Sequence, residues 1–193
     1  MSGQPPANPF STRATLPGAI PFVFHDGQTV EGLVERLGER GWRGAIVGPH
    51  GSGKSTLLVE LLAAVERRFG RTTLFILHEG QRRLPRGWRQ RARDARLIAV
   101  DGYEQLGRIA AWQLRRLCRS RGPGLLVTAH GAVSIPTVYE TRPTLALARS
   151  IVEHLLPDEA KRPDDAHLAA LFRRHEGNLR EVLFSLYDAH EES

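Results

Sequence analysis

Short apolar runs alternate with segments of helical periodicity through the middle of the chain. Runs of four to six mainly apolar residues are typical of buried strands, whereas apolar residues three and four positions apart indicate amphipathic helices. Strands are predicted at residues 44–47, 72–77, 97–100 and 125–129, with a fifth candidate at residues 137–141. Helices are predicted at residues 56–69 and 105–119, and a short one from Val30 to Gly38 or Gly41. Strands that alternate with helices predict a parallel sheet covered on both faces.

The two ends of the chain have different patterns from this middle part. The first 26 residues are rich in Pro, Gly, Ser and Asn but carry apolar anchors such as Phe10 and Phe22, which is typical of an extended arm. After residue 142 the periodicity predicts only helices, at residues 145–156, 165–174 and 179–190. The predicted fold class is therefore α/β, with an arm (1–26), a three-layer α/β/α core with a mostly parallel five-stranded sheet (27–142) and a small helical unit (143–193).

Eight consecutive residues match the phosphate-binding pattern G-x-x-x-x-G-K-[ST]: Gly48, Pro49, His50, Gly51, Ser52, Gly53, Lys54 and Ser55. A predicted strand leads into this loop and a predicted helix leads out of it, as the pattern requires. Glycines let successive N–H groups point at one centre, and the following helix adds its free N-terminal donors. The predicted nucleotide-binding set is these eight residues and Thr56. Lys54 is expected to reach the β- and γ-phosphates and Ser55 to coordinate Mg²⁺, while the side chains of His50 and Ser52 are given no role.

A carboxylate suited to the magnesium shell ends the third predicted strand. Residues 97–100 are apolar and Asp101 follows them, 47 residues after Lys54. An apolar strand ending in Asp, behind such a loop, is the Walker B pattern. ATP and Mg²⁺ are therefore the expected ligands, with Ser55 and Asp101 as the metal-binding residues.

These motifs, with the sequence Gly177-Asn178-Leu179-Arg180 at the start of the last predicted helix, resemble those of the AAA+ ATPases. The resemblance extends from about residue 8 to residue 188, and it implies a P-loop NTPase core with residues 143–193 as a helical lid. It implies that Thr128, with His130 as the second choice, senses the γ-phosphate, and that Arg180 is a lid cation on the same phosphate. It also implies that some of Pro9, Phe10 and residues 20–24 border the adenine.

Two departures from the AAA+ pattern bear on hydrolysis. Gly102 follows Asp101 where most members of the family have the glutamate that polarises the attacking water, so Glu104 and Glu79 are the candidate replacements. Residues 129–136 contain no arginine, although a finger for the neighbouring subunit usually lies there. Both departures favour a slow, switch-like or helper ATPase, or one completed by a partner's residue, over a processive motor.

Alternative functions remain open at this point. A nucleotide-gated binding module with little hydrolysis differs from an ATPase only in its turnover, and a small-molecule kinase would consume ATP only with an added acceptor. The sequence Leu-Ser-Gly-Gly-Gln of ABC transporter ATPases does not occur, and neither does the Asn-Lys-x-Asp base reader of GTPases.

The net charge of +6 and the pI near 10.4 suit a partner that carries phosphates. Of the 27 basic residues 25 are arginine, a skew that a GC-rich genome would also produce. The segment from Gln81 to Arg96 surrounds Trp88 with seven arginines: Arg82, Arg83, Arg86, Arg89, Arg91, Arg93 and Arg96. Arginines bind backbone phosphates and an exposed Trp stacks on a base, so a nucleic-acid contact is predicted here, with a protein partner or a homo-oligomer as the alternatives.

The sequence also predicts a cytoplasmic protein without membrane contact. No apolar run approaches the roughly 18 residues that span a bilayer, and the first residues lack the apolar stretch of a signal peptide. A single cysteine, Cys118, excludes an internal disulfide and a zinc module.

Overall fold

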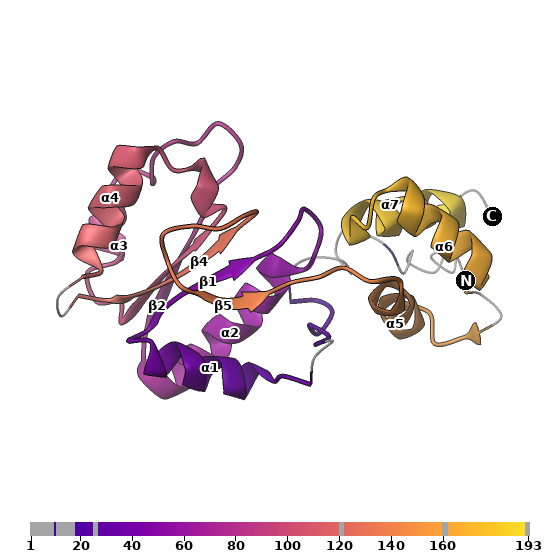
Figure 1. Ribbon diagram of the computed structural model, residues 1–193, viewed down its shortest axis with the longest axis horizontal. Coiled ribbons are helices and arrows are strands. Elements are labelled where there is room, and N and C mark those ends of the chain that lie inside the picture. Colours follow the sequence, from indigo (N-terminus) through magenta and orange to yellow (C-terminus); the bar gives the residue numbers. More distant parts are fainter. Residues whose placement is uncertain (1–9, 11–17, 25–26, 120–121, 160–161, 192–193) are drawn as a thin grey trace, which may run out of the picture.

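The computed structural model describes residues 10, 18–24, 27–119, 122–159 and 162–191 (Figure 1). Five strands form one sheet in the order β2-β3-β4-β1-β5, and every neighbouring pair is parallel. The strands are β1 (Arg43–Val47), β2 (Thr72–Ile76), β3 (Leu97–Asp101), β4 (Gly124–Ala129) and β5 (Thr137–Glu140). The predicted strands, including the fifth candidate, are confirmed, and the sheet that was expected to be mostly parallel is parallel throughout.

Helices cover both faces of the sheet, so the predicted three-layer α/β/α arrangement is confirmed. Successive strand residues point to opposite faces: Ile98 contributes to the hydrophobic cluster beneath α4 (Arg108–Leu117), whereas Ala99 contributes to the cluster beneath α1 (Val30–Glu39) and α2 (Lys54–Phe69). The central strands are therefore buried on both sides, which explains why they are continuous apolar runs in the sequence.

Three helical features differ from the sequence prediction. The helix predicted from residue 105 begins at Arg108, because Gly102 (φ 79°) ends β3 and a 3₁₀ turn occupies Tyr103–Gln105. A short helix α3 (Trp88–Arg91) lies within the arginine-rich segment, where no helix was predicted. Helix α2 starts at Lys54 rather than at residue 56, directly after Gly53.

Three helices at the C-terminal end form a separate lobe beside the sheet (Figure 1). They are α5 (Leu145–Leu155), α6 (Asp165–Arg174) and α7 (Leu179–Glu191), as the periodicity predicted. The side chains of Thr144 and Asp164 cap α5 and α6 by accepting hydrogen bonds from the backbone N–H groups of the first turn. None of the helices in the described part of the chain combines the length and the apolar character needed to cross a membrane.

Phe10 from the N-terminal arm belongs to the hydrophobic cluster of this C-terminal lobe. Its side chain is 2% exposed, among apolar residues of α5, α6 and α7 that include Leu168 and Val182. Its ring meets His190 edge-on, with the centroids 6.3 Å apart. Phe22, twelve residues later, packs against the sheet's cluster on the α1 and α2 side instead. The arm therefore supplies apolar side chains to both parts of the molecule.

Replacing Phe10 by alanine tests whether the arm stabilises the C-terminal lobe. Removing a buried aromatic ring costs about 3–5 kcal/mol in a core that cannot collapse around the cavity. We expect faster amide hydrogen exchange in α5, α6 and α7 and a lower thermal unfolding midpoint, with a smaller change for Phe10→Leu. Exchange rates in the lobe equal to those of the wild type would contradict this role of Phe10.

Candidate functional site

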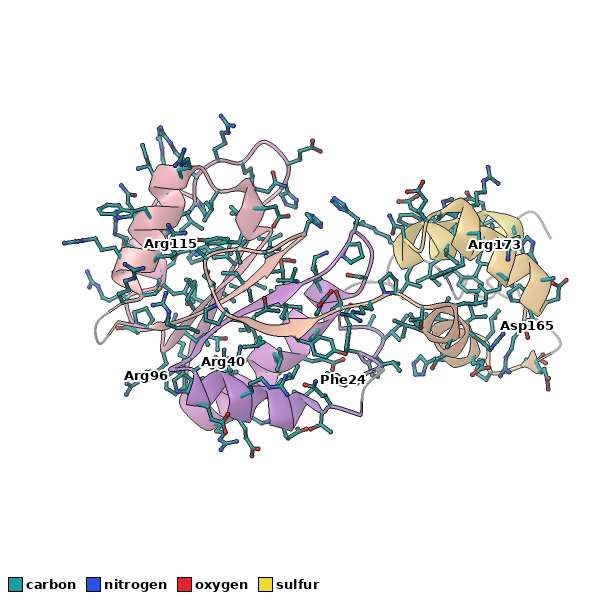
Figure 2. The ribbon with its side chains drawn as sticks, in the orientation of Figure 1. Phe24, Arg40, Arg96, Arg115, Asp165 and Arg173 are labelled. Carbon is teal, nitrogen blue, oxygen red and sulfur yellow. The ribbon has the colours of Figure 1, made fainter. Side chains whose placement is uncertain are left out.

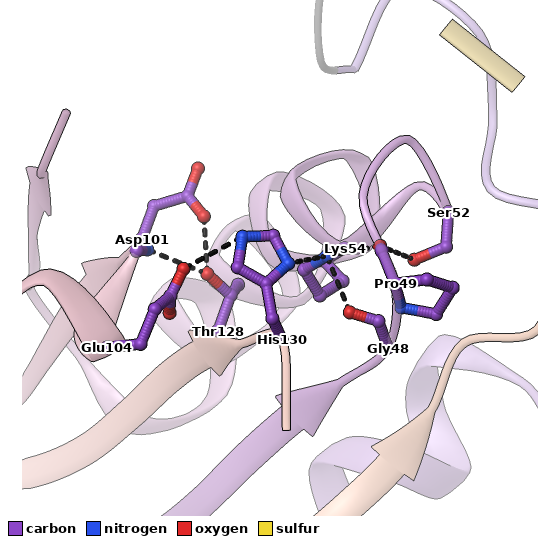
Figure 3. Close-up of polar contacts among 9 residues, drawn as sticks. Gly48, Pro49, Ser52, Lys54, Asp101, Glu104, Thr128 and His130 are labelled. Atoms are coloured by element: carbon purple, nitrogen blue, oxygen red, sulfur yellow. Dashed lines mark hydrogen bonds and ion pairs between the residues drawn. The ribbon is translucent and has the colours of Figure 1, made fainter. Parts of the chain in front are cut away.

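The site lies at the edge of the sheet where the parallel strands end (Figure 3). Because β4 lies between β1 and β3, the loop after β1 and the last residues of β3 and β4 meet at this edge. Five side chains predicted as site residues gather there: Lys54, Asp101, Glu104, Thr128 and His130. They come from three separate segments, which the order of the strands brings to one edge of the sheet.

The loop Gly48–Ser55 needs its glycines at defined positions. Gly51 and Gly53 have positive φ angles of 64° and 85°, in the left-handed region that strains other residues. A Cβ atom at Gly48 would overlap the hydroxyl of Thr141, and one at Gly51 would overlap the Oδ1 atom of Asn178. The glycines therefore serve two purposes, the turn itself and the close approach of two other segments.

Lys54 is the first residue of α2, and its side chain is folded into the loop. The Nζ atom donates to the carbonyl oxygens of Gly48 at 2.8 Å and Pro49 at 2.5 Å, and the residue is 8% exposed. Burial lowers the pKa of Lys54, while the carboxylates of Glu104 and Asp101 act in the opposite direction. The ammonium thus lies at the centre of the loop with two carboxylates within electrostatic reach.

His130 connects this ammonium to Glu104. The Nε2 atom lies 2.9 Å from Glu104 Oε1, and the Nδ1 atom lies 3.3 Å from Lys54 Nζ. An ammonium has only donors, so with Lys54 charged the Nδ1 atom accepts and Nε2–H donates to the carboxylate. Burial and the nearby Lys54 charge lower the pKa of His130, an effect that Glu104 opposes. The ring also stacks on His50, with the centroids 3.6 Å apart.

Asp101 and Thr128 form a second pair beside the first. The Thr128 hydroxyl donates to Asp101 Oδ1 at 2.5 Å and accepts from the backbone N–H of Gly102 at 2.9 Å. Thr128 is 1% exposed, whereas Asp101 is half-buried. The threonine therefore orients the Asp101 carboxylate.

The backbone explains why a glycine follows Asp101. Gly102 has a φ angle of 79°, and a Cβ atom there would lie 2.7 Å from the carbonyl oxygen of Leu77. Any side chain at this position would have to displace the end of β2. Glu104, two residues further on, lies in the 3₁₀ turn Tyr103–Gln105. Its carboxylate reaches the site by its contact with His130.

Ser52 and Thr141 attach the loop to the segment that leads to the C-terminal helices. Their hydroxyl oxygens lie 2.6 Å apart, both residues are about 1% exposed, and the Ser52 hydroxyl also lies 2.8 Å from the carbonyl oxygen of Pro49. No sequence signal predicts this contact, because Thr141 is one of many polar residues at a strand end. The stacking of His50 on His130 has no signal either, since the motif leaves residue 50 unspecified.

Two predicted site residues lie apart from these contacts. Glu79 is exposed in the loop after β2, and in the described residues nothing connects its side chain to the cluster. Arg180 is exposed at the start of α7, with its guanidinium carbon 5.5 Å from the ring centroid of Phe184. The backbone of α7 is nevertheless close to the loop, because Asn178, which accepts from the N–H groups of Arg180 and Glu181, packs against Gly51.

The other predicted residues are spread over α2, the arm and the C-terminal lobe. Ser55 and Thr56 lie in the first turn of α2 and are half-buried. Of the residues expected to border the adenine, Pro9 is outside the described residues, Phe10 is in the C-terminal lobe, and Phe22 lies against Gly53. Within the described residues, no group of three or more His, Cys, Asp or Glu side chains could hold a metal ion.

Comparison with known proteins does not assign a family. No protein-family model matches the chain, and no curated protein shows a significant match to it. The function has to be inferred from the residues and contacts described above.

Replacing Gly51 by alanine tests the contact between the loop and Asn178. Gly80 is a matched control, because its φ angle of 82° is similarly left-handed but a Cβ atom there would have no neighbour within 4 Å. Both alanines carry the cost of a positive φ, about 1–2 kcal/mol, and only Gly51→Ala adds an overlap with α7. We expect the larger drop in thermal stability, and faster hydrogen exchange at the start of α7, for Gly51→Ala. Equal drops in the two variants would contradict the contact.

Proposed function

We propose that the protein binds ATP with Mg²⁺ at the loop Gly48–Ser55 and hydrolyses it slowly, acting as a nucleotide-dependent switch or helper ATPase of the AAA+ type. The observation that carries the proposal is the buried Lys54 ammonium at the centre of this loop, 2.5–2.8 Å from two loop carbonyls and next to Asp101 and Glu104. A cation held in this way in a glycine-rich turn is suited to phosphate oxygens.

Phosphate binding uses the loop and the helix that follows it. Helix α2 has 16 residues, so its free N-terminal N–H groups and its dipole favour an anion at Gly53–Ser55. The ammonium of Lys54 would exchange its two carbonyl partners for oxygens of the β- and γ-phosphates. Phosphate oxygens carry negative charge and carbonyl oxygens do not, so the new bonds of the ammonium would be stronger than the ones that they replace.

Ser55 and Asp101 are the residues that would hold the magnesium ion. Hydroxyl and carboxylate oxygens are the ligands that Mg²⁺ prefers, and its remaining positions are usually filled by phosphate oxygens and water. The bound ion would neutralise charge that develops on the phosphates. Thr128 fixes Asp101 by the 2.5 Å hydrogen bond, which supports a positioning role next to the γ-phosphate.

Glu104 is the proposed general base, with His130 as the residue that orients it. In the reaction a Glu104 oxygen takes a proton from water, the water oxygen bonds to the γ-phosphorus, and the bond from that phosphorus to the β–γ bridging oxygen breaks to leave ADP. The contact of 2.9 Å between His130 Nε2 and Glu104 Oε1 supports this assignment over Glu79, which is exposed and outside the cluster. Arg180 is proposed to reach the γ-phosphate by turning its side chain away from Phe184, because the start of α7 already lies against the loop at Gly51.

One alternative function is favoured by a specific observation. Gly102 leaves the position after Asp101 without a side chain that could polarise water. The site therefore also fits a nucleotide-gated binding module that binds ATP and hydrolyses very little of it. A small-molecule kinase is a weaker alternative. A protein partner and a homo-oligomer stay predictions from the sequence.

Replacing Lys54 by alanine tests nucleotide binding. Loss of charge-assisted hydrogen bonds costs about 1.5–3 kcal/mol, so we expect affinity for Mg²⁺-ATP, measured by isothermal titration calorimetry, to fall about 10- to 150-fold. Arg67→Ala, an exposed cation on the same helix, is the matched control and should leave the affinity unchanged. Equal affinities for Lys54→Ala and the wild type would refute the site.

Replacing Glu104 by glutamine separates binding from hydrolysis. A general base contributes about 10²–10⁴-fold to a rate, so phosphate release from Mg²⁺-ATP should fall by that factor while ATP affinity is retained. Glu79→Gln is the control and should release phosphate at the wild-type rate. A wild-type rate in Glu104→Gln would remove Glu104 as the base, and tight ATP binding without release by the wild type would favour the gated module.

A further inference from the structure

Helix α4 has an outer face that no described segment covers. Its inner face consists of buried residues, Ala111 and Leu114, followed by Cys118 at the cap. On the outer face Ile109 is 75% exposed and Trp112 is 53% exposed. An exposed tryptophan of this kind is uncommon on a surface without a binding role.

The groove beside Trp112 is lined by cations. Arg89 from α3 lies on one side, and Arg115, Arg116 and Arg119 follow Trp112 at intervals that place them on one face of α4 and its continuation. No acidic side chain of the described residues lines this groove. Figure 2 shows Arg115 on α4, at the end of the molecule far from the C-terminal lobe.

Trp112 and Arg116 form an exposed stacking surface. The Arg116 guanidinium carbon lies 5.6 Å from the centroid of the Trp112 ring, and more than half of the Trp112 side chain remains exposed. The guanidinium therefore covers one part of the Trp112 ring, and the exposed part of the ring can stack on another planar group.

Trp88, which the sequence predicts as the stacking residue, is less exposed than Trp112. Trp88 is half-buried and meets Phe75 edge-on, with the centroids 6.5 Å apart, so it is part of the hydrophobic cluster. The seven arginines between Gln81 and Arg96 do not gather on one face either. Arg89 lines the groove beside Trp112, whereas Arg96 lies directly before β3, at the opposite end of the sheet from the site (Figure 2).

We propose that the groove between α3 and α4 binds single-stranded nucleic acid. Arg89, Arg116 and Arg119 contact the phosphates, and an unpaired base stacks on Trp112. Arg115 lines the groove but donates from Nη1 to Tyr103 Oη at 3.2 Å and to Ser134 Oγ at 2.7 Å. The charge of the groove favours nucleic acid over a protein partner. Four arginines and no acidic residue line it, which suits a polyanion, whereas most protein surfaces carry both signs of charge. Stacking selects a single strand over a duplex, because paired bases do not expose their faces.

A second hollow extends this groove toward the nucleotide site. Gln113 lines both hollows, and the residues that line the second include Arg82, Arg83, Arg108 and Glu104. A strand that fills both hollows would therefore reach the turn that carries the proposed base. Binding of the strand does not depend on the proposed ATPase function, so the two can fail separately.

The test is fluorescence anisotropy of a labelled oligo-dT of about twelve nucleotides at low salt. Because one stacked base contributes about 1–3 kcal/mol, Trp112→Ala should weaken binding about 5- to 150-fold, and Trp112→Phe should restore most of the affinity. Arg116→Glu should weaken binding and reduce the slope of log affinity against log salt by about 0.7 for each phosphate that is no longer neutralised. Arg173→Glu on α6 is the matched control, an exposed arginine of the other lobe with the same change in charge, and should bind as the wild type does (Figure 2).

Three results would overturn the proposal. One is no binding of the oligonucleotide at about 50 mM salt, a concentration at which contacts between arginines and phosphates are still strong. Another is an equal decrease in affinity for Arg116→Glu and Arg173→Glu, which would mean attraction by net charge alone. The third is binding that does not depend on base stacking, seen as unchanged affinity in Trp112→Ala or as equal affinity for the matching duplex. Lys54→Ala should keep its affinity for the strand, so failure of the nucleotide site and failure of the groove give different results.

Discussion

The buried ammonium of Lys54 is the constraint on which the rest of the site depends. A charge with 8% exposure is unfavourable unless hydrogen bonds and opposite charges compensate for it. Two carbonyls of the loop supply the hydrogen bonds, and Asp101 and Glu104 supply the charge from the end of β3 and the turn after it. His130 lies between the ammonium and Glu104, and burial and the ammonium lower the pKa of its imidazole while Glu104 opposes this effect. The loop, the two carboxylates and the imidazole are thus one electrostatic unit.

This unit is attached to the C-terminal lobe at two points of the loop. Ser52 bonds to Thr141, which precedes the connection to α5, and Gly51 touches Asn178, which caps α7. A change in the conformation of the loop would therefore displace residues next to the first and the last helix of the lobe. The two contacts are short and involve no long flexible side chain. Such direct contacts are the kind of physical connection that a nucleotide-dependent switch requires.

The layered sheet, its five strands and the three terminal helices could be predicted from periodicity, because buried parallel strands and amphipathic helices leave different spacings in a sequence. Lys54 and Asp101 could be predicted as neighbours, because the loop with Lys54 follows one parallel strand, Asp101 ends another, and such strand ends meet at one edge of a sheet. The partnership of His130 with Glu104 could not, since it depends on how a 3₁₀ turn directs Glu104 back toward β4. The different exposure of Trp88 and Trp112 could not be predicted either. Both tryptophans occur among arginines in the sequence, and only the packing of Trp88 against Phe75 distinguishes them.

The conformation of Gly102 limits how this chain could change over time. With the carbonyl of Leu77 2.7 Å from any Cβ atom there, the edge of the sheet would have to be rebuilt before residue 102 could bear an acid. An acid directly after Asp101 would thus need a shift of the backbone next to β2 as well as a change of side chain. For the proposed ATPase, a group donated by another molecule would be the more direct way to faster turnover, which makes control by a partner the readier path for variation.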